Sequence, residues 1–368
     1  MSQTVTIHLK ESFFGEKETI LAEYADLVAT AFRFESGVCG LRLTNSRGEL
    51  VLLPFQGQQI WSCTFDGRGL QMVSIFDEPR PSPNYLDTYG GFFLHCGATA
   101  MGVPGPQDNH PLHGELPNAP FQSAHLEIGR DQRGPFIALG GAYLHKVAFS
   151  HHYRFEPTVK LYADQTVFPI SAKLTNLKRT PMDWMYMGHL NFRPLDGGRL
   201  VYSAPCTPAA TRIFANVPEH ARSGGDLDEA IAFLEALVEN PSLHTQFSAG
   251  QFIPEAVFAI DYLTDNQGWA HSLQRHPDGY AHYVAHRPAQ LPHGVRWIRR
   301  TPDEDALGLW LPATAEHGGY TAEKKKGFVG QLAAGESVAW QIEAGLLAPN
   351  EAETKTAAIE AILQEAGH

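Results

Sequence analysis

Short β-prone segments separated by turn formers recur along most of this chain, and that rhythm constrains its fold more than any other feature. Within many segments apolar and polar residues alternate, as expected of half-buried strands. Ser36-Gly37 and Asp66-Gly67 are examples of the intervening turns. Many short strands at close spacing predict a mainly β fold, a large antiparallel β-sandwich with a few helices. The clearest segments are Val28–Phe34, Gly40–Thr44, Glu49–Leu53, Pro169–Thr175, Gly279–Ala285 and Ser337–Ile342.

Two stretches carry helix signals. Asp226–Glu239 begins with a capping box, in which Glu229 stands three residues after Asp226, and Pro241 ends the pattern. Ala352–Ala366 predicts a terminal helix that packs its apolar side chains on the body of the protein. We therefore expect helix mainly in these two places. The packing residues expected from the terminal helix are Ile359, Ile362 and Leu363.

The 368 residues contain no clear linker and no internal repeat. We therefore expect one domain spanning residues 1–368, with a helical insertion near residues 226–239. A long stretch rich in glycine and proline runs from Asp77 to Pro120. A long irregular segment inside a compact domain is usually functional, so we expect this one to form the rim of a binding cleft.

The charge balance restricts the partners of the chain. The formal net charge is -12, from 40 acidic and 28 basic residues with no long block of one sign. Nucleic-acid binding needs a basic surface, so we expect no nucleic-acid partner and favour a neutral or cationic small molecule. The basic cluster Lys324–Lys326 is typical of a solvated turn or strand end.

Targeting signals and cysteine spacing favour a cytoplasmic protein. The N-terminus lacks an apolar run of signal-peptide length, and no run of eighteen apolar residues occurs, so we expect no membrane partner. The four cysteines are scattered without a Cys-x-x-Cys pair, which indicates neither a zinc cluster nor a disulfide framework. Such cysteines suit a reducing compartment.

Asn109–Leu116 sets two histidines and a carboxylate within six residues, flanked by turn formers. If Leu112–Leu116 is extended, His113 and Glu115 project from the same face. A histidine and a carboxylate in one cleft can move a proton between oxygen atoms near neutral pH. The pattern therefore predicts acid/base catalysis on a hydroxylated substrate.

A second histidine, His189, stands in a similar setting later in the chain. Gly188 before it allows a close approach to the backbone, and Asn191 on the same strand face can bond a hydroxyl. Arg193 offers a guanidinium fork suited to vicinal hydroxyls or to a carboxylate. We predict that His189, Asn191 and Arg193 belong to the same pocket as His113.

The order of these motifs resembles the galactose mutarotase (aldose 1-epimerase) superfamily, in the form of an atypical branch. Phe34–Gly57 resembles the family's first strands, and Pro111–Gly114 resembles its Leu-His-Gly signature. Leu174–Leu177 followed by Met187–Phe192 resembles its Thr-Asn strand and the subsequent histidine with a nearby phenylalanine. Leu332–Ser337 resembles its last turn. The resemblance therefore extends over nearly the whole chain.

This resemblance implies a β-sandwich of the mutarotase type, with a sugar pocket in an open cleft, no metal and no cofactor. In that family the histidine matched by His189 protonates the ring oxygen, while a glutamate removes the proton of the anomeric hydroxyl. The ring opens, the aldehyde rotates, and the ring closes on either face. The histidine matched by His113 holds the sugar. We therefore expect an aldose 1-epimerase-like isomerase whose partner is a small-molecule sugar.

Three positions of the family's pattern differ in this chain, and one of them is Glu115, where the residue after Leu-His-Gly is commonly uncharged in the family. The strand that carries the family's glutamate matches Leu307–Thr314, where no carboxylate occurs, so we expect Glu115 to serve as the base. The family's arginine falls near His95, which is expected to bind substrate in its place. Two further substrate-binding residues are predicted: Asp261 to hold a hydroxyl, and Trp184 to stack on the apolar face of the ring.

Two other functions remain open on the sequence alone. The residues His95, His110, His113, Glu115 and His189 would suit a metal-dependent sugar isomerase if they converged. Against that, His110-x-x-His113 lacks the i, i+2 spacing that aims two rings one way from a strand. The missing late glutamate favours instead a sugar binder without catalytic activity. The sequence also leaves open the identity of the sugar and the oligomeric state.

Overall fold

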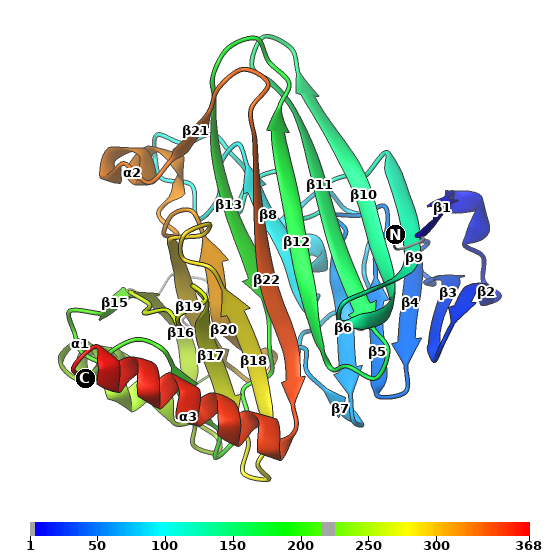
Figure 1. Ribbon diagram of the computed structural model, residues 1–368. Coiled ribbons are helices and arrows are strands. Elements are labelled where there is room, and N and C mark those ends of the chain that lie inside the picture. Colours follow the sequence, from blue (N-terminus) through cyan, green and yellow to red (C-terminus); the bar gives the residue numbers. More distant parts are fainter. Residues whose placement is uncertain (1–3, 215–224) are drawn as a thin grey trace.

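The computed structural model describes residues 4–214 and 225–368, which form two large sheets stacked as layers (Figure 1). All pairings between the described strands are antiparallel, which confirms the predicted fold class. Within the described ranges the first sheet has nine strands. Their order across the sheet is β1 (Val5–Leu9), β9 (Ser123–Asp131), β10 (Gly134–Val147), β11 (His151–Tyr162), β12 (Val167–Asn176), β22 (Ser337–Leu347), β18 (Ala281–His286), β17 (Ala270–Arg275) and β14 (Arg199–Tyr202).

The second sheet has thirteen strands among the described residues. The short strands β7 (Arg68–Gly69) and β21 (Gly330–Leu332) pair with β6 and β13 at its margins. The order of the others is β15 (Thr211–Phe214), β16 (Ile253–Ile260), β19 (His293–Arg300), β20 (Asp305–Ala313), β13 (Met182–Leu190), β8 (Phe93–Ala98), β6 (Ile60–Phe65), β5 (Gly48–Leu52), β4 (Cys39–Asn45), β3 (Leu27–Arg33) and β2 (Thr19–Tyr24).

Apolar alternation along the strands builds the core between the two sheets. On β3, Leu27, Ala29 and Ala31 are almost fully buried, whereas the residues between them lie on the other face. Phe65 of β6 contacts Phe168 of β12 across the interface, with ring centroids 6.1 Å apart. The six strand segments predicted from the sequence correspond to β3, β4, β5, β12, β18 and β22, which confirms the interpretation of the short-strand rhythm.

The two predicted helices are present. In α1 (Leu227–Glu239) the backbone N–H of Glu229 donates to Asp226 Oδ1 at 3.0 Å, as expected of the helix N-terminus. The terminal helix α3 (Pro349–Glu365) lies across β17 and β18 at the lower left of Figure 1. It buries Ile359 and Ile362, while Leu363 packs at the edge of the same contact.

A third helix, α2 (Gly319–Lys326), corrects the expectation for the basic cluster. Lys324–Lys326 form the last turn of this helix rather than a solvated turn or a strand end. Cations interact favourably with the carbonyl groups at a helix C-terminus. Gly327 then ends the helix with a left-handed backbone, at φ 79°.

The Asp77–Pro120 segment is more regular than predicted, because it contains β8 and the short 3-10 helix η2 (Tyr85–Thr88). Leu112–Leu116 is not extended. His113 and Gly114 have φ angles of 60° and 81°, which produce a left-handed turn. His113 and Glu115 therefore do not share one face of a strand, and the prediction that they do is wrong.

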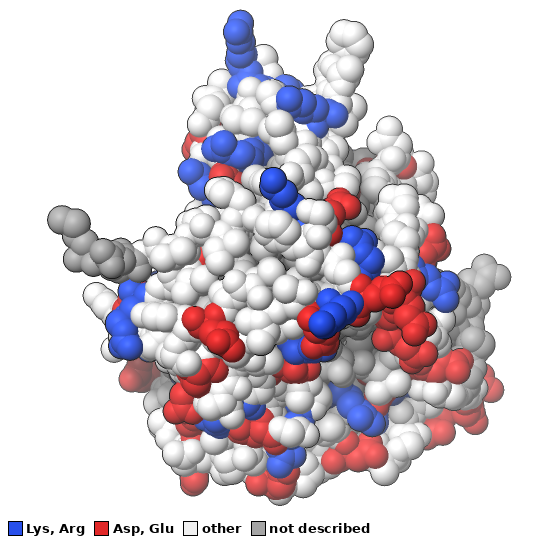
Figure 2. All heavy atoms as spheres, turned by 90° about the vertical axis from the view of Figure 1, so that its right-hand side faces the viewer, with Lys and Arg blue, Asp and Glu red and all other residues white. Residues whose placement is uncertain are grey.

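The surface view shows that the two signs of charge are partly segregated. In Figure 2, lysines and arginines gather at the upper end of the molecule, and aspartates and glutamates crowd its lower part. Figure 1 shows that the upper end includes the tips of β10, β11, β12 and β13.

All four cysteines are free thiols. In the described part of the chain, no helix combines the length and the apolar character that crossing a membrane requires.

Candidate functional site

The register of β13 against β8 decides which face each histidine occupies. Gly188 lies opposite His95, and His189 lies opposite Leu94. Opposed residues share a face of the sheet and successive residues alternate, so His95 and His189 leave the sheet on opposite faces. His95 contacts Phe155 of β11 in the other sheet, with ring centroids 5.0 Å apart. His189 therefore lies on the outer face of the thirteen-stranded sheet.

Four other rings meet around His189 on that outer face. We call the five residues together the histidine cluster: Tyr85, Tyr89, His113, His189 and Trp297. The ring centroid of His189 lies 5.2 Å from that of His113 and 5.8 Å from those of Tyr89 and Trp297. Tyr85 packs on His113 at 4.8 Å. Tyr85, Tyr89 and His113 all come from the Asp77–Pro120 segment, so this segment borders the predicted site. The structure brings His113 and His189 together, as the sequence predicted.

Hydrogen bonding fixes the tautomer of His189. The Nδ2 group of Asn191 donates to the carbonyl of Gly91 at 2.9 Å, so Asn191 Oδ1 is the acceptor that faces His189 Nδ1 at 2.8 Å. His189 Nδ1 therefore carries the proton, and Nε2 presents a lone pair. Burial lowers the pKa of His189 to about 4, against a smaller opposing effect of the Asn191 hydrogen bond. The imidazole is thus neutral near pH 7.

Two buried polar atoms of the histidine cluster lack partners. His113 Nδ1 and Tyr85 Oη make no hydrogen bond of acceptable geometry within the described ranges. The Tyr89 hydroxyl, which lies near Tyr85, donates instead to Asn191 Oδ1 at 3.1 Å. Burial, and then the proximity of His189, lowers the pKa of His113 well below its usual value, and burial raises the pKa of Tyr85 well above its own. Both groups are therefore neutral, and each has unused hydrogen-bonding capacity.

Carboxylates border the cluster on the side of β16 and β19. Glu255 Oε1 accepts a hydrogen bond from Trp297 Nε1 at 3.0 Å. Glu304, in the turn after β19, forms an ion pair with Arg299. Burial raises the pKa of Tyr89 well above its usual value, and the charges of Glu304 and Glu255 add to that rise. Tyr89, His113 and Trp297 are only partly buried, so the cluster is not closed off from solvent.

Glu115 lies in a different environment from the one predicted. Its Oε1 accepts hydrogen bonds from the backbone N–H groups of Ala98 and Thr99, each at 3.1 Å, and from the Tyr153 hydroxyl at 2.5 Å. Its Oε2 accepts from Thr99 Oγ1 at 2.8 Å. Four hydrogen bonds occupy this carboxylate and tie the turn after His113 to the end of β8 and to β11.

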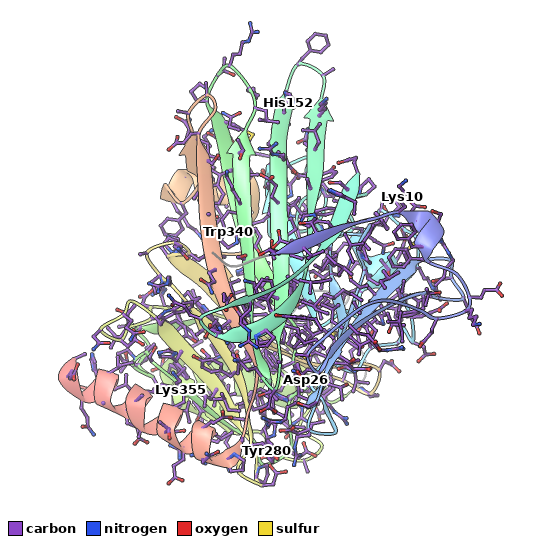
Figure 3. All side chains as sticks on the ribbon, turned by 45° about the vertical axis from the view of Figure 1, so that its right-hand side comes forward. Lys10, Asp26, His152, Tyr280, Trp340 and Lys355 are labelled. Atoms are coloured by element: carbon purple, nitrogen blue, oxygen red, sulfur yellow. The ribbon has the colours of Figure 1, made fainter. Side chains whose placement is uncertain are left out.

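Two predicted substrate contacts are corrected because their side chains point to the core between the sheets. His95 is fully buried there, and its Nδ1 lies 2.8 Å from the Tyr186 hydroxyl. Trp184 stacks on Trp340 of β22 at 5.6 Å, and Figure 3 labels Trp340 on that strand. Neither side chain reaches the outer face that carries His189.

Asp261 and Arg193 lie at the surface. Asp261 forms an ion pair with Arg212 at 2.6 Å, and its side chain is 63% exposed. Arg193 is exposed and follows Asn191 on the same face of the chain, near enough to Asp305 to lower the pKa of that carboxyl against the dominant, raising effect of burial. Arg193 thus lies at the margin of the site, whereas Asp261 belongs to a surface ion pair.

The residues proposed for a metal site do not converge. His95 lies on the opposite face of the sheet from His189, and Glu115 is occupied by its four hydrogen bonds. His110 Nε2 accepts the backbone N–H of Tyr320 at 3.3 Å, at the start of α2. Within residues 4–214 and 225–368 no group of three histidine, cysteine or acidic side chains is arranged to hold a metal ion.

Sequence reasoning missed Tyr85, Tyr89 and Glu255, and it made no assignment for Trp297. No motif marks these residues, because they reach His189 from three separate parts of the chain. Tyr85 and Tyr89 do lie within the Asp77–Pro120 segment, which was expected as a whole to form the rim of the cleft. For Trp297 and Glu255 the only available signal was their alternation on β19 and β16, which does not tell one face of a sheet from the other.

Comparison with known proteins agrees with this architecture. A family model described as "Domain of unknown function (DUF4432)" matches residues 35–346. No curated protein matches the sequence. Among solved structures, a putative aldose 1-epimerase from Klebsiella pneumoniae superposes with a TM-score of 0.77 and 17% sequence identity, covering 99% of this chain and 95% of that chain.

Two more structures extend the comparison. A galactose mutarotase-like protein from Clostridium acetobutylicum has a TM-score of 0.59 and 12% identity, covering 88% of this chain and 99% of that chain. A further putative aldose 1-epimerase, from Escherichia coli K12, has a TM-score of 0.52 and 15% identity, covering 90% and 99%. The fold is therefore galactose mutarotase-like, as the sequence resemblance implied.

Proposed function

We propose that this chain, which belongs to the family described as a domain of unknown function (DUF4432), binds a small sugar at the histidine cluster and interconverts its anomers. The observation that carries the proposal is the pair of buried, unpartnered atoms, His113 Nδ1 and Tyr85 Oη, beside the lone pair of His189 Nε2. Buried polar groups normally have partners, so such a group points to a ligand that supplies them.

The chemistry of the cluster suits a sugar. A pyranose has an apolar C–H face and a rim of hydroxyls, each of which both donates and accepts hydrogen bonds. Tyr89 and Trp297 offer aromatic surface to the first, and His113 and Tyr85 offer hydrogen bonds to the second. Arg193 at the margin is available to an outer hydroxyl. All of these groups except Arg193 are neutral, in agreement with an uncharged ligand.

The lowered pKa of His189 suggests how anomers interconvert. Neutral Nε2 takes the proton of the anomeric hydroxyl as the bond from C1 to the ring oxygen breaks and the aldehyde forms. The imidazolium then gives that proton to the former ring oxygen, which becomes the C5 hydroxyl. After the aldehyde rotates, the same steps in reverse close the ring on the other face. General acid/base catalysis of this kind contributes roughly 10²–10⁴-fold in rate.

A carboxylate near His189 would stabilise the imidazolium that forms when His189 takes the proton. Glu255 is the group that the geometry favours, because Trp297 Nε1 holds it next to the cluster. The sequence analysis predicted instead that Glu115 is the base and His189 the acid, and this assignment stays a prediction. The four hydrogen bonds of the Glu115 carboxylate fit an anchoring role better.

Proton exchange spectroscopy on a panel of aldoses tests the proposal. We expect the wild-type protein to accelerate exchange between the α and β anomers of at least one aldose. Glu255→Gln should slow this exchange, whereas Glu115→Gln should weaken sugar binding with a smaller effect on the rate at saturation. The opposite ranking would establish Glu115 as the base.

A sugar binder without catalytic activity is the second candidate, favoured by the absence of a carboxylate from Leu307–Thr314, most of which lies in β20. It predicts saturable binding of an aldose, by calorimetry, with anomer exchange at the uncatalysed rate. Absence of both binding and exchange with every aldose tested would refute both candidates.

A further inference from the structure

A hollow lies on the outer face of the thirteen-stranded sheet, the face that also carries the histidine cluster, and we call it the aromatic groove. Its volume is about 450 Å³. Arg42, Val51 and Ser62 are directly opposed in the ladder from β4 to β6, so all three project from one face. Their face is the outer one, because the neighbouring Leu41 and Leu52 are fully buried in the core. The groove is thus built over β3 to β6.

The lining of the groove combines aromatic surface with hydrogen-bonding edges. Phe32, Phe34, Trp61 and Phe76 supply the aromatic part. Arg42 extends over Phe32 at 5.0 Å while it pairs with Glu18 at 2.6 Å and with Glu49 at 3.4 Å. Ser62, Gln71 and Asp77 complete the polar edge. Aromatic faces beside fixed polar groups suit a sugar ring for the same reason as in the histidine cluster.

The groove and the histidine cluster share a wall. Tyr89 belongs to the cluster, and the next residue, Gly90, lines the groove. Ser74 Oγ, also in the groove, donates to the carbonyl of Tyr89 at 2.8 Å. A side chain at Gly90 would press on Trp61, because a Cβ there would lie 3.2 Å from the indole ring. The backbone at this wall therefore follows the groove floor closely.

The separation of the two sites can be read from the sheet. His189 is on β13 and Trp61 on β6, and β8 alone lies between these strands. Two steps between neighbouring strands amount to about 10 Å across the sheet, and the register sets Trp61 two residues, or about 7 Å, away from His189 along the strands. This span is comparable to the length of a disaccharide, so one ligand can occupy both sites.

The charges around the aromatic groove favour a neutral ligand. Arg42 is already paired with two glutamates, and Asp77 adds another acidic group at the edge of the groove. A phosphate or carboxylate placed there would meet an excess of negative charge and find its nearest cation engaged. A neutral saccharide meets neither cost.

From these observations we propose that the aromatic groove binds a second sugar ring, so that the preferred ligand is a neutral reducing disaccharide or a longer reducing saccharide. This inference rests on the proposed function. The reducing ring occupies the histidine cluster, where its anomeric carbon reaches His189. The next ring stacks in the groove on Trp61.

Fluorine NMR of protein labelled with 5-fluorotryptophan tests this arrangement, because Trp297 reports on the cluster and Trp61 on the groove. The chain has six tryptophans, so Trp61→Phe and Trp297→Phe variants assign the two resonances. We expect a monosaccharide to shift the resonance of Trp297 alone. A reducing disaccharide such as lactose, cellobiose or maltose should shift both.

The other outcomes separate the two proposals. Shifts of Trp297 alone with every saccharide would overturn the groove proposal and leave the proposed function intact. No shift at either residue would overturn both. A shift of Trp61 alone on addition of a saccharide would show that the sugar binds the groove without entering the histidine cluster, and would overturn the inference. A shift of Trp61 that depends only on protein concentration would show that a second copy of this chain occupies the groove, and would overturn the inference as well.

A matched pair of variants sharpens the test. Ser62→Phe fills the groove from a half-buried outward position, and Thr64→Phe makes the same change on the same face of β6, outside the groove. Loss of one stacked ring corresponds to about 1 kcal/mol. We therefore expect Ser62→Phe to weaken disaccharide binding by about fivefold relative to monosaccharide binding. Thr64→Phe should keep the wild-type ratio, and an unchanged ratio in Ser62→Phe would contradict the proposal.

Discussion

The histidine cluster and a second polar cluster in this protein both contain histidine and tyrosine, and they differ in how many of their polar atoms have hydrogen-bond partners. The second cluster, which we call the arginine cluster, lies around Arg296 of β19. Arg296 is fully buried and donates to the Leu309 carbonyl at 3.0 Å, to His244 Nε2 at 2.8 Å and to the Tyr262 hydroxyl at 3.2 Å. Its guanidinium also lies 4.1 Å from the ring centroid of Tyr202.

In the arginine cluster each polar atom of the histidine and tyrosine side chains near Arg296 has a hydrogen-bond partner. His244 Nδ1 donates to the Pro241 carbonyl, which leaves Nε2 free to accept from Arg296. Burial, and then the Arg296 charge, lowers the pKa of His244 to about 3, so this histidine is neutral as well. The histidine cluster also combines histidine with tyrosine but leaves Tyr85 and His113 without partners. Unused hydrogen-bonding capacity at Tyr85 and His113, rather than burial or a shifted pKa, is therefore the difference between these two clusters.

The largest expected effect tests whether the arginine cluster is structural. Arg296→Met should lower the free energy of unfolding by about 3–5 kcal/mol, since it leaves buried acceptors without their donor. Urea unfolding followed by circular dichroism measures the change. A loss below about 1 kcal/mol would show that these hydrogen bonds contribute little and would weaken the contrast.

The next test compares one histidine from each cluster. His189→Asn should reduce catalysed anomer exchange by about 10²-fold or more, because no other lone pair replaces Nε2. His244→Asn should instead lower stability and leave exchange per folded molecule unchanged. His152→Asn, near the top of β11 in Figure 3, is a control for the substitution itself. Equal effects of the first two variants on exchange would remove the distinction between the clusters.

Acidification should reveal the buried neutral histidine. The pKa of His189 is about 4 in the folded protein. It is about 6.5 in the unfolded chain, which therefore binds more protons below pH 6.5, and stability falls as the pH drops from about 6.5 toward 4. At pH 5 this one group accounts for a loss of roughly 2 kcal/mol relative to pH 7. In His189→Asn that part of the loss should be absent from unfolding curves recorded at the two pH values, and an unaltered pH dependence would contradict the assignment.

The smallest expected effect is the change in stability when a tyrosine hydroxyl is removed, and its sign should differ between the two clusters. Tyr85→Phe removes a hydroxyl without a partner, so stability should stay the same or rise slightly, while sugar affinity falls by about three- to tenfold. Tyr262→Phe removes a hydroxyl bonded to Arg296 and Ser272, and should cost about 1 kcal/mol of stability. Thermal melts and calorimetric titration measure the two quantities. A clear loss of stability in Tyr85→Phe would mean that its hydroxyl has a partner after all.

Local patterns predicted most of the fold. Alternation in segments such as Val28–Phe34 reports directly on strand formation and on which side is buried, and the capping residue Asp226 marks where a helix begins. The helix α2 was missed because its low apolar content gives no periodic signal and its first turn is held from elsewhere. Thr321 and Tyr320 donate their backbone N–H groups to Asp108 and His110, which are distant in sequence.

The candidate site was predictable only in part. His113 and His189 were found from their motifs, and the structure places their rings in contact. The faces of His95 and Trp184 depend on strand register, which a one-residue shift would invert. The position of Glu115 depends on the left-handed backbone at His113, which nothing in the local sequence requires. Long-range pairing therefore decides what local pattern cannot.

The hydrogen bonds of Glu115 also have a thermodynamic consequence for ligand binding. The turn that carries His113 is held on both sides, by Glu115 and by backbone bonds from His113 N–H to the Gly102 carbonyl and from Gly97 N–H to the His113 carbonyl, each at 3.0 Å. Fixing the backbone of a residue costs about 1–2 kcal/mol in conformational entropy. Since this ordering is complete when the chain folds, a sugar that reaches His113 does not have to order the turn again. Loosening the turn would transfer that entropy cost to each binding event.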